Sequence, residues 1–259
     1  MSSLRLETDL RRALEREEIV PYYQPIVDLD AGAIIGFEAL ARWRHPTLGI
    51  IAPDLFIPVA EETGLVTAIG AWMLAEACRQ ARDWQRRHPG QRALGISVNV
   101  SGRQLAQGGV ASEVERVLGE TGLDPASLTL EITESALMHN LNAGAGVIQR
   151  LHAMRIGLHL DDFGTGYSSL AYLHSFPVHA LKVDQSFVTK MDHARQQSAI
   201  VKAIVSLAHN LGMEVIAEGV ETRAQADALR ALGCRRGQGF LFSQPVPAED
   251  AERLLARGL

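Results

Sequence analysis

Leu128-Thr129-Leu130-Glu131-Ile132-Thr133 alternates apolar and polar side chains, which places three aliphatic residues on one face of a strand and Glu131 on the other. A parallel strand that is buried on both faces is normally apolar on both. Glu131 therefore interrupts the expected pattern near the end of its strand. A carboxylate in a core is costly unless it is paired or binds a metal.

Other strand-like segments also end in acids or amides. They are residues 97–101 with Asn99, 158–162 with Asp161 and Asp162, 181–184 with Lys182 and Asp184, and 215–218 with Glu218. In residues 34–43, alternation places Glu38, Leu40 and Arg42 on one face. The repetition indicates that several strands together assemble one cluster of oxygen ligands.

The spacing of these acids is that of βα units. Asn99 and Glu131 are 32 residues apart, Glu131 and Asp161 are 30 apart, and Asp184 and Glu218 are 34 apart. Apolar residues that recur at helical spacing predict helices near residues 7–18, 66–87, 112–120, 143–154, 195–211, 224–232 and 248–256. Strands at 20–27 and 34–43 flank a turn-like stretch and predict an antiparallel hairpin, and a last strand is predicted at 239–243.

This alternation predicts an α/β fold, a (β/α)8 TIM-like barrel with an antiparallel first strand. Residues 1–259 are expected to form a single domain, in which residues 1–18 are an N-terminal helix leading into the barrel. A doubly wound open sheet is less favoured, because no glycine-rich phosphate loop follows an early strand. Catalytic groups of barrels lie at the C-terminal ends of the strands, where these acids occur.

Composition narrows the class of protein. Hydrophobic residues make up 47% of the chain, which is enough for a sizeable core, and the formal net charge of −5 disfavours nucleic-acid binding. The sequence has no apolar stretch long enough for a membrane span and no signal-peptide core. Its two cysteines are expected to be packed, reduced thiols. A cytoplasmic location is the expectation.

The acids, one amide and near absence of histidine or cysteine in the cluster suit Mg²⁺ or Mn²⁺ rather than Zn²⁺. So many acids cannot all stay ionised together unless cations offset them. Two metal ions about 3.5–4 Å apart would do so, and they would also activate water for displacement at phosphorus. Arg42 suits a phosphate contact. Lys182 is conspicuous because it is one of only three lysines in the chain.

These residues carry a family resemblance over nearly the whole chain. The motifs are Glu38-Ala39-Leu40, Asn99-Val100-Ser101, Glu131-Ile132-Thr133-Glu134-Ser135, Asp161-Asp162-Phe163-Gly164-Thr165-Gly166, Lys182-Val183-Asp184, Ala217-Glu218-Gly219-Val220-Glu221 and Gln238-Gly239-Phe240. In this order and spacing they resemble the EAL-domain cyclic di-GMP phosphodiesterases. The resemblance implies hydrolysis of cyclic di-GMP to linear pGpG with Mg²⁺ or Mn²⁺, two ions in all, and inhibition by Ca²⁺.

The resemblance also implies a role for each matching residue. Glu38, Asn99, Glu131, Asp161, Asp162 and Glu218 would hold metal; Lys182, Glu218 and Glu38 would be catalytic; Leu40, Arg42, Asp184 and Gln238 would contact substrate; Glu134, Glu221, Gly164 and Gly166 would support the site. Lys182 would orient or polarise the attacking water. Whether Lys182, Glu218 or hydroxide on a metal takes the proton stays open.

Three positions depart from the family pattern without removing a metal ligand: Gln185, Phe240 and His159. Alternation places His159 on the inward face beside Asp161, where it either tunes the site or is simply a hydrogen-bonded barrel residue. Lys182 is also consistent with a structural ion pair with Asp184. Glu221 and Glu134 are each also consistent with an acid at a helix N-terminus.

Two other functions compete with hydrolysis of cyclic di-GMP. One is a catalytically silent receptor or interaction module of EAL fold, which the complete ligand set disfavours. The other is an unrelated Mg²⁺-dependent barrel enzyme of the enolase kind, which the motifs around Asp161 and Glu218 disfavour. A homodimer is expected from the resemblance, as is fusion to or regulation by a sensor domain, and the chain is either a stand-alone enzyme or a domain excised from a larger signalling protein.

Overall fold

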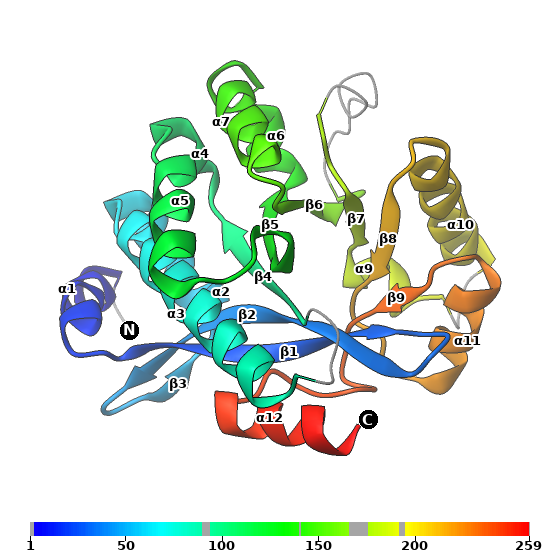
Figure 1. Cartoon of the computed structure of the whole chain (residues 1–259), viewed down its shortest axis with the longest axis horizontal. Coiled ribbons are helices and arrows are strands. Elements are labelled where there is room, and N and C mark those ends of the chain that lie inside the picture. Colours follow the sequence, from blue (N-terminus) through cyan, green and yellow to red (C-terminus); the bar gives the residue numbers. More distant parts are fainter. Residues whose placement is uncertain (1–2, 90–93, 140, 166–175, 192–194, 259) are drawn as a thin grey trace.

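The strands form a closed ring with helices outside it (Figure 1). The computed structural model describes residues 3–89, 94–139, 141–165, 176–191 and 195–258. Within these residues the strands are β1 (Ile19–Asp28), β2 (Ala33–His45), β3 (Gly49–Ile51), β4 (Gly95–Val100), β5 (Leu128–Thr133), β6 (Gly157–Phe163), β7 (Ala180–Val183), β8 (Glu214–Ala217) and β9 (Arg236–Gly237). The ring runs β1-β9-β8-β7-β6-β5-β4-β2 and closes through β1–β2, with β3 added at the edge of β2.

The first strand alone runs against its neighbours in this described ring. β1 pairs antiparallel with β2 and with β9, whereas β2 to β4 and each later neighbour in the ring are parallel. The predicted (β/α)8 barrel with an antiparallel first strand is therefore confirmed. Parallel strands place their C-terminal ends on one rim, which is why residues far apart in sequence meet there.

Helices follow most strands and cover the ring. They are α1 (Ser3–Glu15), α2 (Pro53–Thr63), α3 (Val66–Arg87), α4 (Gly102–Gln107), α5 (Val110–Thr121), α6 (Glu134–His139), α7 (Leu141–Ala153), α9 (Gln185–Val188), α10 (Arg195–Asn210), α11 (Arg223–Ala231) and α12 (Ala248–Arg257), with a 3₁₀ turn at Pro125–Ser127. None of the described helices is both long and apolar enough to cross a membrane.

The helix α3 shows how sequence pattern becomes packing. Ile69, Met73, Ala77 and Ala81 recur every fourth residue, and all are buried on the face that packs against β1, β2 and β4. Trp84 continues this face and lies edge-on to Tyr23, with ring centroids 4.8 Å apart. A continuous apolar layer therefore joins the ring to its helices.

The interior of the ring changes from apolar to charged along the strands. Ile26, Ala180 and Ile216 form a small buried cluster inside it. Two residues further along β7, on the same face as Ala180, lies Lys182. Apolar packing therefore closes the N-terminal side of the barrel, and charged groups collect toward the C-terminal rim.

One predicted strand is wrong. Residues 239–243 form turns, in which the backbone N–H groups of Phe242 and Ser243 donate to the Gly239 carbonyl, and the strand lies earlier, at β9. Phe240-Leu241-Phe242 has strand-like composition, but the ring is already closed by the pairing of β9 with β1. The short helices α4, α6 and α9 and the longer α2 were not predicted.

Candidate active site

A single buried lysine lies among four carboxylates. The Nζ atom of Lys182 lies 2.5 Å from Glu131 Oε2, 2.7 Å from Glu218 Oε1, 3.2 Å from Glu38 Oε2 and 3.3 Å from Asp161 Oδ1. Its side chain is wholly inaccessible to solvent. The alternative ion pair with Asp184 is not formed, because that carboxylate instead caps α9 by accepting from the Ser186 backbone N–H.

The four acids come from four different strands or strand ends. Glu38 is in β2, Glu131 in β5 and Asp161 in β6, and Glu218 directly follows β8. Their convergence follows from the parallel register, which for example places Asn99 opposite Glu131 and Thr133 opposite Asp161. Closure of the ring turns a repeated strand-end pattern into one site.

Burial and charge act in opposite directions on these groups. Burial alone would lower the pKa of Lys182, but the surrounding carboxylates raise it well above its ordinary value. Burial alone would raise the pKa of Glu38, but the Lys182 charge and hydrogen bonds from Gln238, Asn99 and Lys182 outweigh it, so this pKa is lowered. Glu38 is therefore held as a carboxylate.

Three other acids of the site, Glu131, Glu218 and Asp162, have raised pKa values. Burial, and then repulsion from Glu38, raises the pKa of Glu131 to about 8 despite Lys182. Burial likewise raises the pKa of Glu218 well above its ordinary value, and burial and Asp161 raise that of Asp162. One ammonium does not offset the charge of this group.

Two amides complete the contacts of Glu38. Asn99 Nδ2 donates to Glu38 Oε1 at 2.7 Å, and Gln238 Nε2 donates to Glu38 Oε2 at 2.7 Å. The same Gln238 nitrogen donates to Gln24 Oε1 at 2.8 Å, which links β1 to the site. Gln238, a predicted substrate contact, therefore donates a hydrogen bond to Glu38, a predicted metal ligand.

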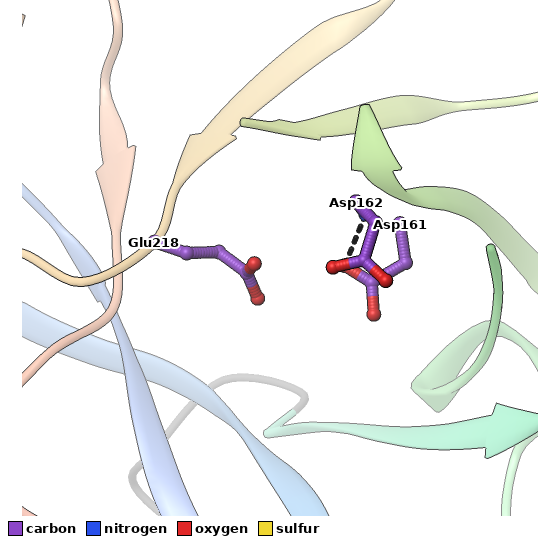
Figure 2. A group of neighbouring side chains, drawn as sticks. All are labelled: Asp161, Asp162 and Glu218. Carbon is purple, nitrogen blue, oxygen red and sulfur yellow. Dashed lines mark hydrogen bonds between the residues drawn. The ribbon is translucent and has the colours of Figure 1, made fainter. Parts of the chain in front are cut away.

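Asp161, Asp162 and Glu218 each offer a carboxylate oxygen, and these atoms lie within 4.8 Å of one another. In Figure 2 the Asp161 and Asp162 carboxylates, from the end of β6, lie together opposite the Glu218 carboxylate. Asp161 also accepts from the Asp162 backbone N–H at 3.0 Å. Asp162 has φ of 54°, a left-handed conformation that is uncommon outside glycine and is often found at functional sites.

The donor set fits divalent cations. Four acids, Glu38, Glu131, Asp161 and Glu218, contact one ammonium, and Asp162 lies beside Asp161. Among the described residues, the buried Glu131 Oε1 has no hydrogen-bond partner. An unpartnered buried carboxylate oxygen is costly unless a cation or donor reaches it. Because all ligands are oxygens, the site suits a hard cation such as Mg²⁺ or Mn²⁺.

A cavity of about 980 Å³ opens beside this cluster. Its lining includes Glu38, Asn99, Asp161, Asp162 and Glu218. Its volume lies at the upper end of the range usual for ligand sites. The acids therefore face a space large enough for an organic ligand as well as metal ions.

Only two of the four predicted substrate contacts are among the described residues that line the cavity. Leu40 and Gln238 line the cavity, whereas Arg42 and Asp184 are not among the described residues that line it. The Arg42 guanidinium lies 5.8 Å from the Tyr22 ring centre and donates to the Ala41 carbonyl at 2.9 Å. Burial lowers the pKa of Arg42.

Three of the predicted supporting residues, Glu134, Gly164 and Glu221, lie at the rim. The buried Glu134 accepts from the Gly164 backbone N–H at 3.2 Å through Oε2. Glu221 lines the cavity, just before the N-cap Thr222 of α11. Gly166 lies outside the described residues.

Other residues that line the cavity were not predicted as site residues. They are Asp54, Glu61, Arg103, His139 and Phe240, among others. Phe240 is 59% exposed although it is large and apolar, which suits contact with an aromatic base. Phe240 stands in a motif already noticed, and Arg103 follows the strand that carries Asn99; Asp54 and Glu61 lie on α2, for which no signal was recognised.

Gly239 should not tolerate a side chain. A Cβ there would overlap the Val220 backbone, so Gly239→Ala should displace the neighbouring Gln238 and lower the free energy of unfolding by about 1–3 kcal/mol. Urea unfolding followed by circular dichroism would measure this. In the control Gly119→Ala, on an open face of α5, the change should be neutral or stabilising by up to about 1 kcal/mol. Equal effects at the two positions would contradict the steric argument.

Comparisons with known proteins agree with this geometry. A family model described as the EAL domain matches residues 7–245. MucR of Pseudomonas aeruginosa, described as a bifunctional diguanylate cyclase/cyclic di-GMP phosphodiesterase, is 47% identical over 247 residues, which cover 95% of this chain and 36% of MucR. NbdA of the same organism, a cyclic di-GMP phosphodiesterase, is 41% identical over 252 residues, covering 97% of this chain and 32% of NbdA.

The chain thus spans about a third of the length of these two curated relatives. A solved structure described as the PaMucR phosphodiesterase in complex with c-di-GMP has a TM-score of 0.91 and 46% identity to the chain. The match covers 95% of this chain and 99% of that one.

Proposed function

The chain belongs to the EAL domain family, and from this premise we propose that it hydrolyses one phosphodiester bond of cyclic di-GMP to give linear pGpG, with the help of two divalent cations. The observation that carries the proposal is the cluster of four acids around buried Lys182, with Asp162 beside them and a cavity of about 980 Å³ next to the cluster. Two relatives whose names include cyclic di-GMP phosphodiesterase support the choice of substrate.

Glu38, Asn99, Glu131 and Asp161 would hold one cation, and Asp161, Asp162 and Glu218 the second. The close approach of the last three carboxylates supports this division. Bound Mg²⁺ or Mn²⁺ would make water more acidic and stabilise charge that develops on the phosphate. Ca²⁺ takes more ligands in a looser geometry, so we expect it to bind without supporting turnover.

Lys182 would keep its proton. Four carboxylates hold its ammonium and raise its pKa, so it serves as a hydrogen-bond donor that orients water and ligands rather than as a base. Glu218 lies on the cavity wall and is more accessible, with a side chain that is 19% exposed. It is therefore better placed to accept a proton from the attacking water as the new P–O bond forms. The P–O bond on the opposite side breaks, and the ribose oxygen that is released takes up a proton from water.

Leu40, Gln238 and Phe240 line the cavity and would contact the dinucleotide. Arg42 and Asp184 remain proposed substrate contacts, although neither is among the described residues that line the cavity. Glu134 and Glu221 would support the rim.

We also propose that residues 1–259 act as one EAL domain, that the protein is a homodimer in the cytoplasm, and that a sensor domain regulates it. Light scattering after size-exclusion chromatography would test the dimer, and a mass of about one chain would contradict it.

Chelation tests the proposed reaction directly. Purified protein should convert cyclic di-GMP to pGpG with Mg²⁺ or Mn²⁺ and should form no product with Ca²⁺ or with EDTA, as measured by chromatography. Restoring Mg²⁺ after EDTA is the control for irreversible loss. Binding of cyclic di-GMP without turnover under every condition would instead identify a receptor.

A further inference from the structure

Two buried polar atoms, for which the described part of the chain provides no hydrogen-bond partner, face each other inside the barrel. They are Nδ1 of His159 and Oε1 of Glu131, and they lie 3.8 Å apart. Their residues are paired across β5 and β6, so both side chains leave neighbouring strands toward the interior. His159 is 9% exposed and Glu131 1%.

His159 Nδ1 can donate the hydrogen bond that Glu131 Oε1 can accept. A neutral imidazole carries its proton on one ring nitrogen and a lone pair on the other. A proton on Nδ1 points a donor at the carboxylate oxygen, whereas a proton on the other nitrogen sets a lone pair against it. Shortening the separation by about 1 Å brings the pair within hydrogen-bonding distance.

The contact needs only a proton on Nδ1, which a neutral imidazole can carry without adding a positive charge. The other oxygen of Glu131 is already held by Lys182 at 2.5 Å.

We propose that His159 is a positioning residue, which donates its Nδ1–H to Glu131 Oε1 and so orients this carboxylate toward a bound divalent cation. Each carboxylate oxygen has two lone pairs, so both can accept a hydrogen bond and still bind metal. Groups behind a metal ligand commonly fix its orientation in this way. This inference rests on the metal site of the proposed function.

Metal binding by two variants tests the role of Nδ1. His159→Leu removes the donor at similar size, whereas His159→Asn places its amide nitrogen where Nδ1 lies. Titration with Mn²⁺, followed by electron paramagnetic resonance of the free ion, should show binding that is about 10–100-fold weaker in His159→Leu and close to wild type in His159→Asn. The surface variant His152→Leu is the matched control and should bind as wild type does.

The outcomes separate the inference from the proposed function. Wild-type affinity in His159→Leu would overturn the positioning role while leaving the metal site intact. No Mn²⁺ binding by the wild type would overturn the metal site, and with it this inference.

A second measurement needs no variant and so does not depend on His159→Leu folding. Nitrogen-15 NMR of the Mg²⁺-loaded wild-type protein should show His159 as the Nδ1–H tautomer. The opposite tautomer would overturn the proposal.

Discussion

Lys182→Met should abolish turnover and lower the free energy of unfolding of the metal-free protein by about 3–5 kcal/mol. Methionine keeps the length of the side chain but removes the ammonium that contacts Glu38, Glu131, Asp161 and Glu218. Breaking a buried ion pair by removing one partner is strongly destabilising, because the other charge stays buried and uncompensated. Here four carboxylates lose the same partner.

Urea unfolding in EDTA and in Mg²⁺ would measure the change, and chromatography would measure turnover. Part of the lost stability should return in Mg²⁺, because a bound cation supplies positive charge to the same carboxylates. Lys202→Met, at an exposed position of α10, is the matched control and should leave both quantities unchanged. Unfolding of Lys182→Met in EDTA at the wild-type urea concentration would contradict the ion-pair argument.

Glu38→Ala should reduce turnover more than about 100-fold. Removal of a group that only orients a metal ligand costs up to about 100-fold, and removal of the ligand itself should cost more. It should do so while the fold is kept. After the change, Lys182 retains three carboxylates and the Gln238 amide retains its bond to Gln24. The loss of stability should therefore be smaller than for Lys182→Met.

Far-UV circular dichroism and thermal unfolding, together with product analysis, would test this contrast. Glu62→Ala, at an exposed position of α2 away from the cavity lining, is the control and should keep turnover. Wild-type turnover in Glu38→Ala with an unchanged spectrum would refute the role of Glu38 as a ligand.

Much of the fold was predictable because its signals are local. Alternation in residues 128–133 and in the related strands, with helices between them, predicted the barrel, and the hairpin pattern predicted its antiparallel first strand. The strand predicted at residues 239–243 failed because its apolar residues lie in turns after β9 has already paired. Composition alone could not distinguish these two outcomes.

The residue types of the candidate site were predictable, but the contacts that its side chains make were not. Carboxylates at strand ends stand out in sequence, because a core rarely accepts them without a purpose. That Asp184 caps α9 and that Arg42 lies against Tyr22 depended on local contacts that alternation does not report. The cavity residues on α2 likewise carried no recognisable signal.

By itself the sequence determined the barrel, the EAL family and the acids that gather at the strand ends, since hydrophobic periodicity and motif spacing are written into neighbouring residues. Only the tertiary structure decided that Lys182 contacts four carboxylates at once and that His159 faces Glu131. Lys182 lies 144 residues from Glu38 and 51 from Glu131. Such contacts exist only after the strands pair in order and the ring brings β2 close to β7, and they set the charge balance of the site.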